Sequence, residues 1–105
     1  MKRRSRKVTD AVEILHRRYL KTPRAEQAIE VTRVNAEIAC NIYELREKAK
    51  LTQTQLAKLI GTSTSVISRL EDADYEGHSL SMLQRIAFAL NKRVEITFVS
   101  KKRSA

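Results

Sequence analysis

Four neighbouring side chains in the middle of the chain could bind a polar surface: Thr64, Ser65, Ser68 and Arg69. Three of them are short and carry hydroxyl groups, and the fourth ends in a planar, permanently charged guanidinium. On a helical wheel they share one arc of residues 64–70, and the apolar residues share the other arc. This segment is therefore predicted to bury its apolar arc and to present hydrogen-bonding groups to a ligand.

A second short helix is predicted immediately before this one, over residues 53–60. Thr52 and Gln55 fit a capping box at its start, and Gly61 follows its end. Because glycine adopts positive φ at little cost, the chain can reverse there. One arc of this helix is expected to be buried and consists of Leu56, Ala57, Leu59 and Ile60.

Two short helices joined by a tight turn have the geometry of a helix-turn-helix. Thr62 or Ser63 can cap the second helix by accepting a hydrogen bond from its free N–H groups. In such a unit the first helix crosses the DNA backbone, and the N-terminal part of the second enters the major groove. The polar arc of residues 64–70 would then face the bases.

The motifs LTQTQLA, GTSTSVISRLE and SLSMLQRIAFAL, within residues 36–90, resemble the Xre-type regulators, which include the lambdoid phage repressors. This resemblance implies a mainly α, lambda-repressor-like bundle. It also implies that Gln53 bonds a DNA phosphate and that three residues occupy base-reading positions. Those three residues are Thr64, Ser65 and Arg69, and Ser68 beside them reaches either a base or a phosphate.

The same resemblance implies an ion pair between Arg46, in the preceding helix, and Glu71, which closes the recognition helix. We expect this half-buried pair to position the reading helix rather than to catalyse a reaction. Further candidates for phosphate contacts lie in the turn and in the loop after the second helix: Thr62, Ser63, Tyr75 and His78.

The formal net charge of +9 is concentrated at the two ends of the 105-residue chain. Residues 1–7 form a basic arm and residues 101–105 a basic tail, whereas the rest of the chain is nearly balanced. The arm is compatible with a nuclear signal, a membrane-surface anchor, a segment that lies along phosphates, or a solvated tail without a specific role. The adjacent DNA-binding motif favours phosphate binding.

The sequence contains no apolar run long enough to span a membrane and no secretory leader, so a cytoplasmic location is expected. Its single cysteine, Cys40, cannot form an internal disulfide and falls on an apolar helical stripe, where a buried thiol is expected.

Residues 8–35 form an extension that a compact helix-turn-helix domain does not require. A helix is predicted over residues 8–20, and a second begins at Pro23 with Thr22 as its cap and continues to about Lys48. The apolar residues of the first helix are candidates for binding a partner protein: Val8, Val12, Leu15 and Tyr19. The alternative is that this helix folds back and covers the domain.

Residues 91–100 contain the one strand pattern in the chain, in which polar and β-branched or aromatic residues alternate. Because a lone strand leaves its backbone groups unpaired, it is predicted to pair with the same strand of a second subunit in a homodimer. The apolar side chains of this dimerisation strand would face the helices: Val94, Ile96 and Phe98.

A helix-turn-helix core followed by one C-terminal strand is similar to the HigA- and HipB-type antitoxins of bacterial toxin–antitoxin modules. This resemblance implies a dimeric repressor that binds double-stranded operator DNA, autoregulates its operon and neutralises a RelE/HigB-like toxin. The alternative is a stand-alone Xre-family regulator without a toxin partner.

Other classes of function fit the sequence less well. The sequence has two isolated histidines and one cysteine, and it shows neither a glycine-rich phosphate loop nor metal-ligand spacing. It therefore predicts no enzyme, no metal and no cofactor. An RNA-binding module would present exposed aromatic side chains for stacking on bases. Phe88 and Phe98 are instead expected in the core.

Overall fold

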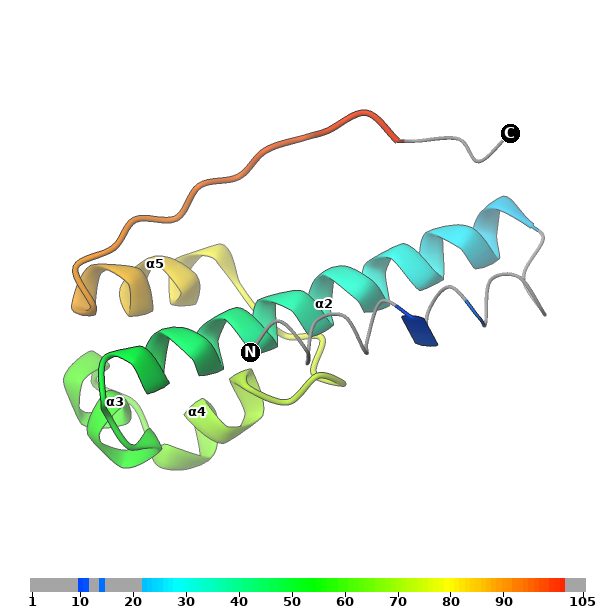
Figure 1. Cartoon of the computed structure of the whole chain (residues 1–105). Coiled ribbons are helices and arrows are strands. Elements are labelled where there is room, and N and C mark those ends of the chain that lie inside the picture. The colour runs from blue at the N-terminus through cyan, green and yellow to red at the C-terminus, as the bar shows by residue number, and fades with distance from the viewer. Residues whose placement is uncertain (1–9, 12–13, 15–21, 102–105) are drawn as a thin grey trace.

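The structure is a computed structural model that describes residues 10, 11, 14 and 22–101. Asp10, Ala11 and Ile14 are helical, as predicted for residues 8–20. The rest of the described chain forms helices, turns and an extended C-terminal segment, without a strand (Figure 1). Its helices are α2 (Pro23–Lys48), α3 (Gln53–Ile60), α4 (Thr64–Leu70) and α5 (Leu80–Ala89).

Helix α2 is continuous over 26 residues, as its apolar periodicity predicted. It begins at Pro23, whose missing N–H costs nothing in the first turn, and the hydroxyl of Thr22 accepts a 3.1 Å hydrogen bond from the N–H of Ala25. It ends before Lys50, which has a positive φ of 60°. Its buried residues begin at Ala36, so the N-terminal half projects beyond the core.

Helices α3 and α4 meet at Gly61, which has the left-handed conformation expected for this turn, with φ 74°. The predicted capping box is present: the Thr52 hydroxyl accepts from the N–H of Gln55, and the Gln55 side chain accepts from the N–H of Thr52. Ser63 caps α4 by accepting from the N–H of Val66. Local sequence therefore determines both helix starts and the reversal between them.

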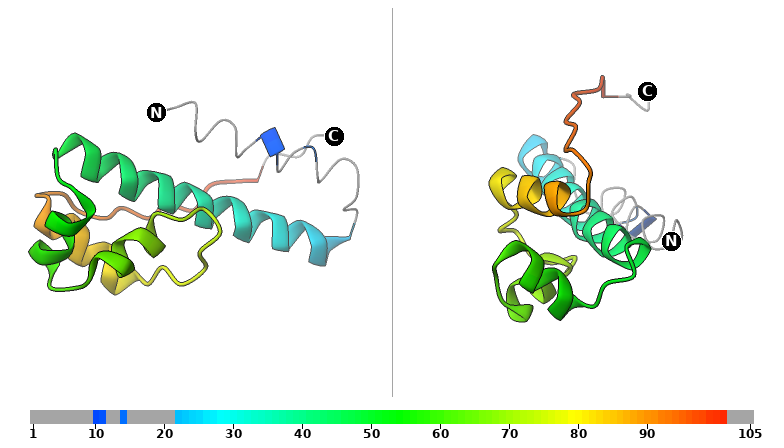
Figure 2. Two further views of the ribbon diagram at one scale, coloured as in Figure 1. Left: turned by 90° about the horizontal axis from the view of Figure 1, so that it is seen from below. Right: turned by 90° about the vertical axis from the view of Figure 1, so that its left-hand side faces the viewer.

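The core lies where α3, α4 and α5 gather beside the C-terminal half of α2 (Figure 2). Leu56, Ile67 and Ile86 are at most 1% exposed and form its centre. Cys40 is buried as a free thiol, as predicted. The core cluster also contains one residue of α2 and further residues of α3 and α4: Ile42, Ala57, Ile60 and Leu70.

Three residues that we expected in the core are exposed. Leu59 is 55% exposed because it lies at the edge of the α3 arc defined by its buried neighbours. Phe88 is 86% exposed because it lies two residues beyond Ile86, on the opposite side of α5. Phe98, in the C-terminal segment, is 96% exposed, so the prediction of two core phenylalanines is wrong for this chain by itself.

Residues 92–101 run back past α2 from the end of α5 (Figure 1), and Lys101 Nζ lies 3.9 Å from Glu26 Oε1. The segment is extended, but within the described residues it has no strand partner. Val94 is half-buried, whereas Ile96 is 64% exposed. Pairing with a second subunit therefore stays a prediction.

Candidate nucleic-acid interface

Helix α4 is buried on one side and exposed on the other, as the helical wheel predicted. Ile67 and Leu70 are 0% and 3% exposed and fix the helix on the core, with Val66 half-buried beside them. The opposite face consists of the four predicted reading residues, all exposed: Thr64, Ser65, Ser68 and Arg69. Among the described residues none forms an ion pair with Arg69. The face thus offers three hydroxyl groups and an unneutralised guanidinium.

One contact on this face joins the two helices of the motif. The Oγ1 atoms of Thr54, near the start of α3, and Thr64, at the start of α4, lie 3.0 Å apart, and either hydroxyl can donate. Both side chains are exposed. Thr54 was not among the predicted site residues, since its type is ordinary for a helix start and only its position beside Gln53 hinted at a role.

The turn before α4 places two more hydroxyl groups at the same end of the helix. Ser63 is exposed and its Oγ accepts a 3.3 Å hydrogen bond from the N–H of Val66, which leaves its proton available for another acceptor. Thr62 is half-buried, and its N–H donates to the carbonyl of Ala57. The proposed phosphate contacts of both residues are compatible with this geometry.

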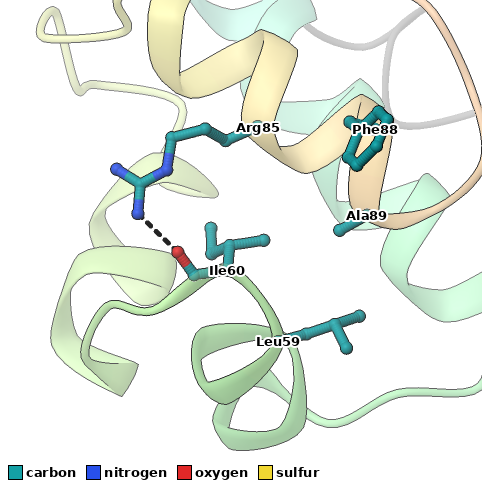
Figure 3. A pocket seen from close by; sticks show the side chains of 5 residues that line it. All are labelled: Leu59, Ile60, Arg85, Phe88 and Ala89. Atoms are coloured by element: carbon teal, nitrogen blue, oxygen red, sulfur yellow. Dashed lines mark hydrogen bonds between the residues drawn. The ribbon is translucent and has the colours of Figure 1, made fainter.

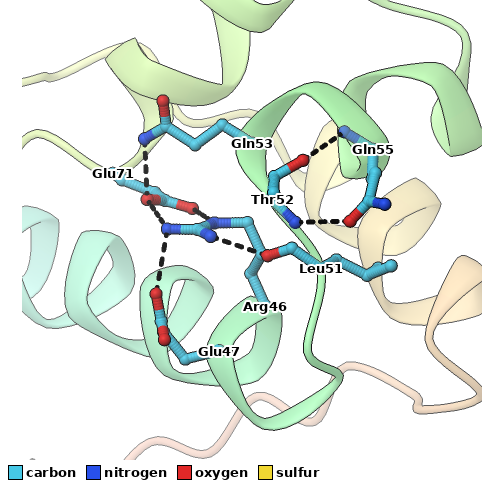
Figure 4. Close-up of polar contacts among 7 residues, drawn as sticks. All are labelled: Arg46, Glu47, Leu51, Thr52, Gln53, Gln55 and Glu71. Carbon is cyan, nitrogen blue, oxygen red and sulfur yellow. Dashed lines mark hydrogen bonds and ion pairs between the residues drawn. The ribbon is translucent and has the colours of Figure 1, made fainter.

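Arg46 and Glu71 form the predicted ion pair, and it ties α2 to the end of α4 (Figure 4). Arg46 Nε donates to Glu71 Oε2 at 2.6 Å, and Nη2 donates to Oε1 at 3.0 Å. The two side chains are 8% and 5% exposed, so the pair is buried rather than half-buried. A two-pronged contact of this kind fixes both distance and orientation between the elements it joins.

The guanidinium of Arg46 makes further contacts within the protein. Its Nη1 donates to the carbonyl of Leu51 at 2.8 Å, its Nη2 lies 3.6 Å from Glu47 Oε2, and it lies over the ring of Tyr43. The hydrogen bond to Glu71 raises the pKa of Arg46 above its ordinary value, against the opposing effect of burial. The arginine stays charged and acts on the site through position.

Gln53 belongs to the same network, because its Nε2 donates to Glu71 Oε1 at 3.1 Å (Figure 4). One carboxylate thus holds both Arg46 and Gln53. The amide nitrogen carries a second N–H, and this group is the one that could reach a phosphate. Glu71 therefore holds the Gln53 side chain in place and leaves one N–H for the predicted phosphate contact.

His78 is poorly placed for the phosphate contact that we predicted. Its Nε2 is 2.7 Å from the carbonyl oxygen of Leu70, and its Nδ1 is buried without a hydrogen-bond partner. Both nitrogens are therefore turned into the protein, and this geometry does not favour a contact between His78 and a phosphate. Tyr75 packs edge-on against this imidazole, with 5.2 Å between ring centroids, and its half-buried ring belongs to the edge of the core.

A second, apolar feature lies between the ends of α3 and α5 (Figure 3). This hollow is lined by Leu59, Ile60, Arg85, Phe88 and Ala89. Arg85 donates from its guanidinium to the carbonyl of Ile60, which joins α5 to the last turn of α3. Two of the residues that line this hollow, Leu59 and Phe88, are exposed, although sequence periodicity predicted both in the core.

The predicted partner-binding residues Val8, Val12, Leu15 and Tyr19 lie outside the described residues. The described part of the extension does present apolar side chains, with Ile14 47%, Val31 50% and Val34 40% exposed. On α2, Arg33 bonds both Glu30 and Glu37 in an exposed triad. The hydrogen bond from Arg33 lowers the pKa of Glu30.

Among the described residues, acidic, histidine and cysteine side chains do not cluster in a way that could hold a metal ion. No helix within residues 10, 11, 14 and 22–101 is long and apolar enough to cross a membrane.

Comparison with known families decides the fold assignment. A family model described as Helix-turn-helix matches residues 42–96. The chain belongs to this helix-turn-helix family. The domain that defines this family is a DNA-binding regulatory domain. Such a function agrees with the exposed polar face of α4. Neither the comparison with curated proteins nor that with solved structures found a match.

Proposed function

We propose that this helix-turn-helix protein is a sequence-specific DNA-binding transcriptional repressor that reads bases through α4. The observation that carries the proposal is the combination of an exposed polar face with a rigid mounting. Thr64, Ser65 and Arg69 project from a helix whose other side is buried, and the Arg46–Glu71 pair fixes its end. A reading helix must hold its side chains at a fixed depth in the groove, and the buried side of α4 together with the Arg46–Glu71 ion pair would hold it in that position.

The proposed contacts divide into two kinds. Arg69 is suited to a guanine, to which a guanidinium can donate two hydrogen bonds in the major groove, and the hydroxyls of Thr64, Ser65 and Ser68 can bond to any base. Gln53 and Ser63 would bond phosphates on either side and fix the register without reading sequence. Thr62 and Tyr75 are secondary candidates for the same backbone contacts.

The test of base reading is the variant Arg69→Ala. On a site selected from random DNA, the loss should be about 1–3 kcal/mol, with relaxed preference at one base pair. Arg24→Ala is the matched control, because Arg24 is an exposed arginine at the start of α2 and its removal changes the net charge equally. An equal loss on selected and random DNA would show that Arg69 contacts a phosphate instead.

We also propose that the protein acts as a homodimer joined through residues 91–100. The extended segment has no strand partner among the described residues, so its backbone groups are open to pairing with the same segment of a second copy. In that dimer two exposed apolar side chains of one face, Ile96 and Phe98, would pack against the helices. Ile96→Asp should convert dimer to monomer in sedimentation experiments. Val99→Asp, at an exposed position on the other face of the segment, should leave the dimer intact. Equal effects of the two variants would argue against this interface.

The biological role that we propose is that of the antitoxin of a type II toxin–antitoxin module, which neutralises a RelE/HigB-like toxin. Support comes from the family match, which begins at residue 42 and does not include the projecting N-terminal half of α2 with its exposed Val31 and Val34. A domain that only bound DNA would not need this projection. The alternative role, a stand-alone Xre-family regulator, agrees equally well with the exposed polar face of α4.

Co-expression with the reading frame adjacent to its gene separates these two roles. An antitoxin should relieve growth arrest caused by that frame and should co-purify with its product. Deletion of residues 1–21 removes the predicted partner-binding residues Val8, Val12, Leu15 and Tyr19, and it should then abolish capture of the toxin but leave most operator binding. Absence of both toxicity and a complex would favour the stand-alone regulator.

A further inference from the structure

We propose that Thr54 determines which bases Thr64 can read, by fixing the direction of the hydrogen bond between their hydroxyl groups. The inference rests on the proposed function, since it assigns a base class to one reading position of α4. Its basis is the 3.0 Å contact between the two Oγ1 atoms, formed across the turn by exposed side chains of α3 and α4.

Two other polar side chains at the start of α3 already make hydrogen bonds within the protein. Thr52 accepts from the N–H of Gln55, and the Gln53 amide donates to Glu71. Thr54 is the residue whose side chain reaches α4 at the reading position itself. Since the first helix of a helix-turn-helix crosses the DNA backbone, the exposed hydroxyl of Thr54 would also meet phosphate oxygens.

The number of protons decides what remains for the base. Each hydroxyl carries one proton and two acceptor lone pairs, and one of the two protons is used within the Thr54–Thr64 pair. An ionised phosphate oxygen can only accept. If Thr54 donates to a phosphate, its proton is spent, and Thr64 must donate to Thr54. The Thr64 oxygen is then left as an acceptor.

An acceptor at this position distinguishes among the bases. In the major groove the available donors are the amino groups of adenine (N6) and cytosine (N4), whereas guanine and thymine present acceptors. Thr64 would therefore favour adenine or cytosine at the base it contacts. Without the Thr54 hydroxyl the proton of Thr64 is free to turn towards any base, and the preference should relax.

The test uses the full chain and four proteins: wild type, Thr64→Val, Thr54→Val and Thr54→Ser. Selection from random DNA with wild type gives the site, and loss of preference in Thr64→Val identifies its base pair. Inverting that pair should weaken wild-type binding about three- to tenfold, as expected for one hydrogen bond. Thr54→Val should reduce this ratio to less than about twofold, whereas Thr54→Ser should retain it.

A base analogue tests the atom directly. Replacing the contacted adenine with purine, or the contacted cytosine with 2-pyrimidinone, removes only the amino group and should weaken wild type about three- to tenfold. Thr64→Val should be insensitive to the same replacement. An unchanged ratio in Thr54→Val, or wild-type binding that ignores the missing amino group, would overturn the inference alone. Failure of wild type to enrich any sequence would overturn the proposed function and this inference together.

Discussion

Replacement of Arg46 with methionine should destabilise the fold far more than the same replacement of Arg33. Both arginines lie on α2 and both contact two carboxylates, but Arg46 and its partner Glu71 have side chains only 8% and 5% exposed. The Arg33 side chain is 32% exposed, and its partners Glu30 and Glu37 are 60% and 41% exposed. Burial is therefore the main difference between the two sites.

The magnitude follows from what each change leaves behind. Arg46→Met leaves the buried carboxylate of Glu71 with Gln53 as its remaining partner, and the carbonyl of Leu51 loses a 2.8 Å hydrogen bond. Removing one member of a buried ion pair costs about 3–5 kcal/mol. For Arg33→Met, whose partners stay hydrated, the loss should be under about 1 kcal/mol.

Urea and thermal denaturation followed by circular dichroism would measure both values. At roughly 4–8 °C per kcal/mol for a domain of this size, Arg46→Met should lower the melting temperature by about 12 °C or more. A second variant with both Arg46 and Glu71 replaced by methionine should recover part of the loss, because it leaves no unpaired buried charge. The reasoning is refuted if Arg46→Met costs no more than Arg33→Met.

Two further predictions concern the turn and the exposed triad. Gly61→Ala should cost about 1–2 kcal/mol in unfolding free energy, because a φ of 74° strains a residue that has a Cβ. Crowding is not the cause, since the added Cβ would meet only Arg85 Nη2 at 3.8 Å, an ordinary contact distance. Gly61→Asn should cost less, because asparagine tolerates this backbone conformation better than alanine. Equal losses for the two variants would point to crowding instead of backbone strain. The carboxyl of Glu30 should titrate below 4.5 in NMR experiments, so its small contribution to stability is present above that pH and is lost as pH falls through the lowered pKa. In Arg33→Met the pKa of this carboxyl should rise, because the hydrogen bond from Arg33 is the largest cause of its lowering.

The local features of the fold could be predicted because each depends on residues close in sequence. Thr52 with Gln55, Gly61 and Ser63 determine the ends of α3 and α4 through hydrogen bonds and a backbone angle that span a few positions. The arc of α4 that faces solvent also followed from the helical period alone. The Arg46–Glu71 pair joins residues 25 positions apart, and only the family resemblance placed it.

The features that the sequence did not predict depend on contacts between a side chain and another element of the fold. Periodicity placed Leu59 and Phe88 inside, yet both are more than half exposed. The hydrogen bond between Thr54 and Thr64 requires α3 and α4 to meet across the turn, and the inward turn of His78 requires the carbonyl of Leu70 at 2.7 Å. A sequence pattern gives the direction of a side chain around its own helix, but not its neighbour on another one.

The unbroken length of α2 makes it a lever. About 24 Å of helix separates Glu30 from Arg46, at 1.5 Å per residue. Since the C-terminal half of α2 is packed in the core, displacing Glu30 by roughly 2 Å would tilt the helix axis at Arg46 by about 5°. Because the Arg46 guanidinium is bonded to Glu71, which closes α4, a change in the angle of α2 would also change the position of the reading helix.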